Sequence, residues 1–121
     1  MKRVLLVEDH SSFRRALAFV LEREPDLRVV AQAGSLAEAR SRVNGESEFD
    51  VAVLDLGLPD GNGMDLISEL RKANPDASIV VLTVDLNPKN QDLALEKGAD
   101  AVLGKEASIT QIVAAVRNLQ A

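Results

Sequence analysis

Carboxylate, hydroxyl and ammonium side chains follow several short apolar runs in this sequence. In chain order they are Glu8, Asp9, Asp55, Thr83 and Lys105. Two carboxylates about 4 Å apart repel by roughly 4 kcal/mol at an effective dielectric of 20. Three acids with one lysine would therefore attract a cation, and hard oxygen ligands favour Mg²⁺ or Mn²⁺. A carboxylate beside such a metal can attack phosphorus, while a hydroxyl and an ammonium bind the transferred oxygens. The residue types thus indicate phosphoryl transfer.

The apolar runs predict five strands that alternate with five helices. The runs are residues 4–7, 27–33, 51–54, 79–82 and 101–103. Apolar residues recur at helical spacing between and after them, and the clearest stripe is Ile109, Ile112, Val113, Val116 and Leu119. This alternation predicts a parallel sheet covered by helices on both faces.

Local signals mark several helix ends. Ser35 with Glu38, and Ser108 with Gln111, have the spacing of capping boxes, and Pro88 suits the first position of a helix. We therefore expect helices to begin after Ser35, at Pro88 and after Ser108.

The strand patterns also predict the order of the sheet. The first, third and fourth runs are continuously apolar, as in strands buried on both faces. The second alternates, and we expect Leu27, Val29, Ala31 and Ala33 on one side of an edge strand. Edges at strands two and five fit a three-layer, doubly wound, flavodoxin-like α/β fold with strand order 2-1-3-4-5. Ligands of such sheets bind beyond the carboxyl ends of the strands, so the polar residues described above should converge there.

Composition excludes several classes of protein. The 121 residues carry a formal net charge of −5 and no cysteine, which argues against disulfides, thiolate metal sites and a nucleic-acid-binding surface. No apolar run approaches the roughly 18 residues of a membrane span. The opening Met1-Lys2-Arg3 does not begin a signal peptide. We expect one cytoplasmic domain over residues 1–121 that contacts no membrane and binds no nucleic acid directly.

Five ordered motifs resemble one known family, the receiver domain of two-component response regulators. They are Glu8-Asp9, the stretch 55–63 (DLGLPDGNG), Thr83, Gly98-Ala99-Asp100 and Lys105. The resemblance runs from Val4 to about Leu119 and is strongest to receivers that precede a helix-turn-helix output domain. Such an output domain is not expected within these 121 residues.

The resemblance implies a role for each acid. Asp55 would be the phosphoacceptor, receiving a phosphoryl group from a phosphohistidine of a partner sensor histidine kinase. Asp9, Asp55 and the backbone carbonyl of Gly57 would bind Mg²⁺, with Mn²⁺ as a second possibility. Glu8 would act mainly through metal-bound water.

The resemblance also implies a switch, and two residues depart from its usual pattern. Thr83 would swing toward the phosphoryl group and Lys105 would pair with it. At the switch position where the family usually carries Tyr or Phe, this chain has Val102, which cannot perform a ring rotation. Val84 replaces a usually small residue and could narrow access to Asp55.

The segment 88–97 is a predicted helix with few apolar residues, namely Leu93, Ala94 and Leu95. A helix with so small a buried stripe gains little from packing. It is either a solvated helix near an edge of the sheet or the element that phosphorylation biases.

The aromatic residues and the lone histidine have plain interpretations. Phe13, Phe19 and Phe49 are predicted to be packing residues. His10 is predicted to be an exposed loop histidine.

Three functions fit the pattern. The first is a phosphorylation-dependent signalling switch of a transcriptional response regulator, which is not a turnover enzyme and could form a homodimer on phosphorylation. The second is a pseudo-receiver scaffold that works without phosphorylation, motivated by Val84 and Val102. The third, a Mg²⁺-dependent phosphatase or phosphotransferase, is disfavoured because such enzymes usually place the nucleophile after the first strand. No Gly-x-Gly-x-x-Gly follows any predicted strand, which argues against a nucleotide-binding fold.

Overall fold

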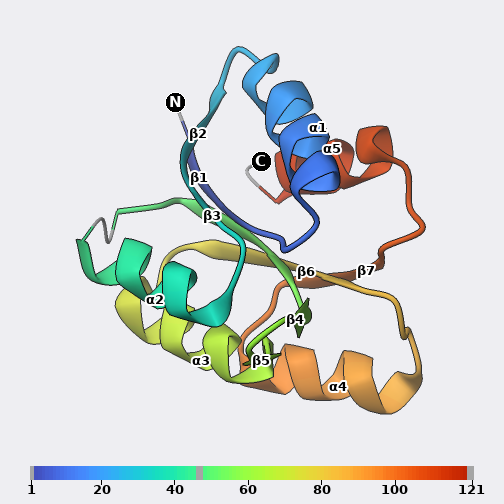
Figure 1. Cartoon of the computed structure of the whole chain (residues 1–121). Coiled ribbons are helices and arrows are strands. Elements are labelled where there is room, and N and C mark those ends of the chain that lie inside the picture. The colour runs from blue at the N-terminus through green and yellow to red at the C-terminus, as the bar shows by residue number, and fades with distance from the viewer. Residues whose placement is uncertain (1, 46–47, 120–121) are drawn as a thin grey trace.

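A computed structural model describes residues 2–45 and 48–119 as a parallel five-stranded sheet with helices on both faces (Figure 1). The sheet has the order β2-β1-β3-β6-β7, which confirms the predicted order 2-1-3-4-5. Its strands are β1 (Lys2–Val7), β2 (Leu27–Ala33), β3 (Val51–Asp55), β6 (Ser78–Thr83) and β7 (Ala101–Gly104). The helices are α1 (Ser11–Glu22), α2 (Leu36–Gly45), α3 (Met64–Ala73), α4 (Pro88–Lys97) and α5 (Ile109–Asn118). No helix in the described ranges is long and apolar enough to cross a membrane.

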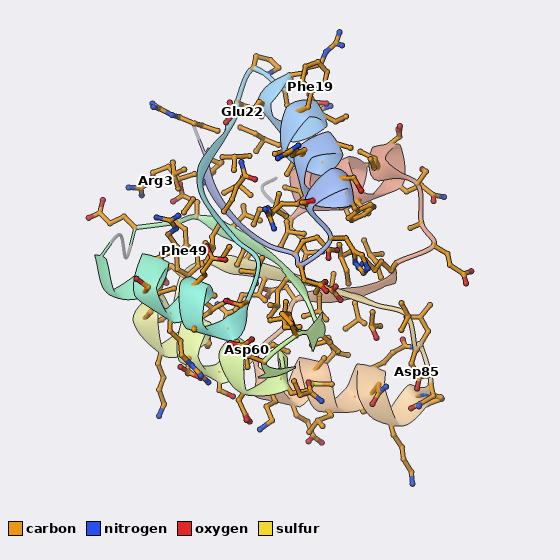
Figure 2. All side chains as sticks on the ribbon, viewed as in Figure 1. Arg3, Phe19, Glu22, Phe49, Asp60 and Asp85 are labelled. Carbon is orange, nitrogen blue, oxygen red and sulfur yellow. The ribbon has the colours of Figure 1, made fainter. Side chains whose placement is uncertain are left out.

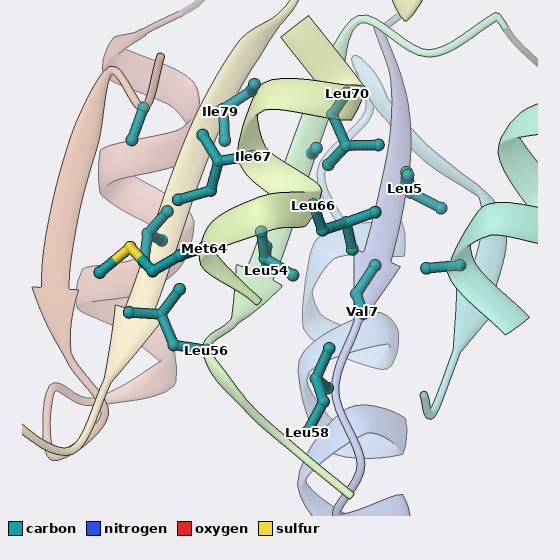
Figure 3. Packing of buried hydrophobic residues seen from close by; sticks show 14 of the residues in the cluster. Leu5, Val7, Leu54, Leu56, Leu58, Met64, Leu66, Ile67, Leu70 and Ile79 are labelled. Carbon is teal, nitrogen blue, oxygen red and sulfur yellow. The ribbon is translucent and has the colours of Figure 1, made fainter. Parts of the chain in front are cut away.

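The two faces of the sheet carry separate cores. Helices α1 and α5 cover one face, and α2, α3 and α4 cover the other (Figure 1). On the second face, side chains of β1, β3 and β6 pack against α3, as Figure 3 shows for Leu5, Leu54 and Ile67. Because β3 is buried on both faces along its whole length, its last residue, Asp55, is fixed in place.

Strand β2 departs from the prediction that its apolar residues share one side. Leu27 and Val29 pack with the core under α1 and α5, whereas Ala31 and Ala33 pack with the opposite core. The pairing of β1 with β2 shifts by one residue after Val29, so that Val30 has no partner in the register. One extra residue reverses the faces of all that follow, because side chains alternate along a strand.

A short hairpin that was not predicted follows β3. Its strands are β4 (Gly57–Leu58) and β5 (Gly61–Asn62), which pair antiparallel. Gly61 has φ of 152°, and a Cβ there would lie 2.7 Å from Leu36 Cδ1, so glycine fits both the backbone and the space. Asp60, labelled in Figure 2, accepts hydrogen bonds from the Leu36 and Ala37 backbone N–H groups at 2.8 and 3.0 Å. The loop after Asp55 is therefore tied to the first turn of α2.

The predicted helix starts are largely confirmed. Ser108 and Gln111 form a reciprocal capping box at α5, and Pro88 opens α4. At α2 the box is incomplete: Ser35 Oγ accepts from the Glu38 N–H, but Glu38 Oε1 accepts from Gly34 N rather than Ser35 N. The Asp60 carboxylate supplies additional caps there from a distant part of the chain.

The prediction that all three phenylalanines are packing residues is wrong for one of them. Phe49 is buried and Phe13 packs at the edge of the core under α1 and α5, but Phe19 is 62% exposed. Phe19 lies two residues after the buried Leu17, which places it on the far side of α1 (Figure 2).

Candidate functional site

The predicted site residues come from four adjacent strands at one edge of the sheet. Glu8 and Asp9 follow β1, Asp55 ends β3, Thr83 ends β6, and Lys105 follows β7. The strands are parallel, so their carboxyl ends meet on the same side. The predicted convergence of the acids with Lys105 is confirmed by the contacts described below.

Lys105 lies at the centre of the acidic group. Its Nζ is 2.9 Å from Asp55 Oδ2 and lies 2.8 and 3.1 Å from Glu8 Oε1 and Oε2. Burial alone would lower the pKa of Lys105, but hydrogen bonds to Asp55 and Glu8 outweigh it and raise that pKa. The Lys105 backbone N–H donates to the Thr83 carbonyl at 2.7 Å, which fixes the start of the side chain beside β6. The ammonium therefore stays charged and is directed at the two carboxylates.

The acids form a cluster that could hold a metal ion. Glu8, Asp9, His10 and Asp55 each place one ligand atom within 4.8 Å of the others. Burial raises the pKa of Glu8, whose side chain is fully buried. Burial also acts to raise the pKa of Asp9, but the neighbouring Glu8 carboxyl group and the charges of His10 and Lys105 lower it overall. The cluster thus mixes one carboxyl group that resists ionisation with one that favours it.

Two buried oxygens of this cluster lack hydrogen-bond partners among the described residues. They are Glu8 Oε1 and Asp9 Oδ1; the first lies near Lys105 Nζ but accepts no well-aligned hydrogen bond from it. Buried unpaired oxygens are costly unless something binds them. When ionised, three carboxylates and one ammonium leave a net charge of −2, which a divalent cation would neutralise. The donor set therefore fits a hard divalent ion.

The Asp55 carboxylate is buried, but its oxygens can still accept further hydrogen bonds. Its side chain is 4% exposed, Oδ2 accepts from Lys105, and Oδ1 accepts from the Gly57 N–H at 3.1 Å. Each carboxylate oxygen can accept more than one hydrogen bond. Asp55 is thus a rigidly held carboxylate with spare lone pairs, which is what a nucleophile or a metal ligand requires.

The Thr83 hydroxyl is engaged in the loop before α4. Its Oγ1 accepts from the Asp85 N–H at 3.1 Å and donates to the Asp85 carbonyl at 3.2 Å. Beside it, Val84 is 83% exposed and lines a cavity of about 480 Å³ together with Thr83, Leu86 and Lys105. The cavity lies beside Thr83 and Lys105, has none of the three acids in its lining, and leaves the Val84 side chain mostly in solvent.

Val102, at the predicted switch position, is half-buried. Its side chain packs at the edge of the core formed with α2, α3 and α4. It therefore contacts the core of the α4 face rather than the acidic cluster.

His10 is the site residue that sequence reasoning missed. Its ring is 67% exposed, as expected of a loop, but Nδ1 lies 3.4 Å from Glu8 Oε2 and from Asp9 Oδ1. Nδ1 also lies 3.0 Å from Lys105 Nζ. The signal available in the sequence was its position directly after the acid pair at a strand end.

The chain belongs to the response regulator receiver domain family, whose model matches residues 4–117. The chain is 39% identical over 121 residues to the DNA-binding transcriptional activator DevR/DosR of Mycobacterium tuberculosis. This alignment covers 100% of the chain and 55% of that regulator. The chain thus spans about half the length of this relative.

Solved structures agree with the family and the fold. A LuxR-family two-component response regulator from Aurantimonas matches 98% of this chain and 84% of its own, with 28% identity and a TM-score of 0.87. A response regulator from Burkholderia pseudomallei, solved with a phosphorylated aspartic acid, a calcium ion and citrate, is 33% identical with a TM-score of 0.83. That match covers 99% of this chain and 71% of the other.

Proposed function

We propose that this chain is a phosphorylation-dependent signalling switch that accepts a phosphoryl group on Asp55. The observation that carries the proposal is the buried Asp55 carboxylate, held by Lys105 Nζ at 2.9 Å beside a cluster of further acids. The Burkholderia relative contains a phosphorylated aspartic acid and a calcium ion, which supports the same chemistry here.

Mg²⁺ is the proposed cofactor. Asp9, Asp55 and the Gly57 carbonyl would hold it directly, and Glu8 would act through metal-bound water, with Mn²⁺ as a substitute. When bound, the ion supplies positive charge that offsets the acids and attracts phosphoryl oxygens. The Asp9 Oδ1 oxygen, which has no hydrogen-bond partner among the described residues, is available as a ligand for this ion.

Phosphoryl transfer would start from a phosphohistidine of a sensor histidine kinase. An Asp55 carboxylate oxygen attacks the phosphorus, the phosphorus–nitrogen bond breaks, and the histidine leaves with the electron pair of that bond and takes up a proton. Lys105 would neutralise one of the phosphoryl oxygens, because its ammonium already donates a hydrogen bond to Asp55 Oδ2. The residues of the site thus position the reacting groups and neutralise the charge on the phosphoryl oxygens, and these two effects account for most of the catalysis of phosphoryl transfer.

The switch would act through Thr83. Its hydroxyl can donate to a phosphoryl oxygen on Asp55 only by giving up its donation to the Asp85 carbonyl, and turning toward Asp55 also removes the acceptor of the Asp85 N–H. Loss of this turn would release the loop that leads into α4. Val102 has no ring to follow the movement, so the loop and α4 would carry the change. In a longer regulator this change would control DNA binding by an output domain and pairing of two chains.

The test is covalent labelling. Incubation with acetyl phosphate and Mg²⁺ should add one phosphoryl group, detected by intact mass spectrometry and released by hydroxylamine. Asp55→Asn and removal of the metal with EDTA should each abolish the adduct. The control Asp76→Asn, at an exposed acid away from the site, should retain it.

Three results would contradict the proposal. Absence of an adduct in the unmodified chain would favour a scaffold that works without phosphorylation. An adduct that persists in Asp55→Asn would place the phosphoacceptor elsewhere. Continuous release of inorganic phosphate from small phosphorylated substrates would instead indicate a turnover enzyme.

A further inference from the structure

We propose that His10 contributes a nitrogen ligand to the divalent-cation site, and so shifts its preference from Mg²⁺ toward Mn²⁺ and Co²⁺. The inference rests on the proposed function, because it concerns the same metal. A ring nitrogen of His10 is one of four ligand atoms that lie within 4.8 Å of one another, together with oxygens of Glu8, Asp9 and Asp55, and Nδ1 lies 3.4 Å from oxygens of Glu8 and Asp9.

The ring of His10 faces the cluster with a nitrogen that can donate an electron pair. Nδ1 lies 3.0 Å from Lys105 Nζ. A lysine ammonium has donors and no acceptor, so the neutral imidazole with Nδ1 unprotonated is the form that accepts in this contact. Its lone pair is therefore directed at the charged centre of the site, where a cation competing with the ammonium would find it.

Local backbone structure holds His10 in this place. It is the residue before α1, with an extended backbone, and its side chain makes no capping bond to the helix. Its own N–H donates to the fully buried Glu8 Oε2 at 3.0 Å. The hydrogen bond to the buried Glu8 thus holds the backbone of His10 close to the acids, and its imidazole is not used for helix capping.

A nitrogen ligand raises the affinity of the site for some metal ions more than for others. Carboxylate and carbonyl oxygens suit Mg²⁺ and Mn²⁺, whereas imidazole suits later first-row ions, whose affinities rise from Mn²⁺ to Co²⁺ and beyond. Mg²⁺ keeps its waters and gains little from a nitrogen. A site with His10 should therefore bind Co²⁺ and Mn²⁺ more tightly than an all-oxygen site, with little change for Mg²⁺.

The experiment compares the unmodified chain with His10→Gln, which removes the imidazole at an exposed position and keeps a polar side chain. Calorimetric titration should show that His10→Gln weakens Co²⁺ binding by at least about tenfold, the low end of the losses seen when even an outer-shell partner of a metal ligand is mutated, and leaves Mg²⁺ binding unchanged. Pulsed electron paramagnetic resonance of bound Mn²⁺ should detect a nitrogen coupling that His10→Gln abolishes. Ser12→Ala, an exposed change two residues further along α1, should behave as the unmodified chain.

The outcomes separate this proposal from the one above. If Mn²⁺ in the unmodified chain shows no nitrogen coupling, or if His10→Gln leaves the ratio of Co²⁺ to Mg²⁺ affinity unchanged, His10 is not a ligand. In either case Mg²⁺ binding and labelling of Asp55 would still stand. If neither Mg²⁺ nor Co²⁺ binds the unmodified chain, both proposals fail together.

Discussion

Helices α3 and α4 are neighbours of equal length on the same face of the sheet, yet they are held in opposite ways. Both span ten residues. The α3 helix buries Met64, Leu66, Ile67 and Leu70. In α4 the buried residue is Ala94, while Leu93 and Leu95 are 40% and 49% exposed. The comparison shows that two adjacent helices can differ widely in how much the core fixes them.

The α4 helix is held mainly at its ends. The Asn87 side chain accepts from the Asn90 N–H at 2.9 Å at the start of the helix. After its last turn, the Gly98 carbonyl accepts from Arg71 Nη2 of α3 at 2.7 Å. The first of these ends follows the loop tied by Thr83, so a change at the site can reach α4 without disturbing a core. The α3 helix has no such freedom, because moving it would open a cavity.

The largest difference should appear when one apolar side chain is truncated in each helix. Ile67→Ala deletes a fully buried side chain of α3 and should lower the free energy of unfolding by about 2–5 kcal/mol. Leu93→Ala in α4 should change it by no more than about 0.5 kcal/mol. Urea denaturation of both variants measures the two effects. Equal losses would break the comparison.

Removing the cap of α4 should have a smaller and local effect. Asn87→Ala leaves the Asn90 N–H without its acceptor and should cost about 1 kcal/mol. Amide hydrogen exchange should quicken over residues 88–97 and stay unchanged over residues 64–73. Equal acceleration in both helices would show that α4 is part of the same cooperative unit as α3.

Lowering the pH should loosen α2 at its start while leaving the start of α4 in place. Hydrogen bonds from the Leu36 and Ala37 N–H groups lower the pKa of Asp60. This stabilisation is present above the carboxyl pKa of about 3.9 in the unfolded chain. It is lost as the pH falls through the lower folded-state value. The cap of α4, Asn87, is an amide and does not titrate.

Amide chemical shifts of Leu36 and Ala37 measured across acidic pH provide the check. They should move below about pH 4, and the Asn90 amide should not follow them. In Asp60→Asn the movement should disappear. Parallel shifts of the Asn90 amide in the unmodified chain would indicate general acid unfolding instead.

The smallest effect is expected for the ion pair that joins the two helices at the surface. Lys97 Nζ lies 3.9 Å from Asp65 Oδ1, whose side chain is 78% exposed. Lys97→Gln should change the free energy of unfolding by less than about 0.5 kcal/mol, since exposed pairs are screened by water and salt. A larger loss of the free energy of unfolding, measured by urea denaturation, would mean that the pair helps to hold α4.

The fold could be predicted from the sequence because its signals are local. Continuous apolar runs identify buried strands, and their order follows from which runs alternate. The convergence of Asp55 and Lys105 then follows from parallel strands ending at one edge. No knowledge of side-chain packing was needed for these steps.

The parts that escaped prediction depend on contacts between distant segments or on a single extra residue. The bulge at Val30 reverses half of β2, and nothing in the alternation of that strand reveals it. Asp60 caps α2 from 24 residues away. The direction of the His10 ring depends on where Lys105 arrives from β7, at the other end of the chain.

Hydrogen exchange with a phosphoryl mimic tests the central claim most directly. With Mg²⁺ and beryllofluoride bound, exchange should change over the loop 83–87 and over α4, and stay unchanged over α3. Asp55→Asn should show no change in either helix. Unchanged exchange of α4 in a chain shown by mass spectrometry to carry the mimic, or an equal change in α3, would contradict the account.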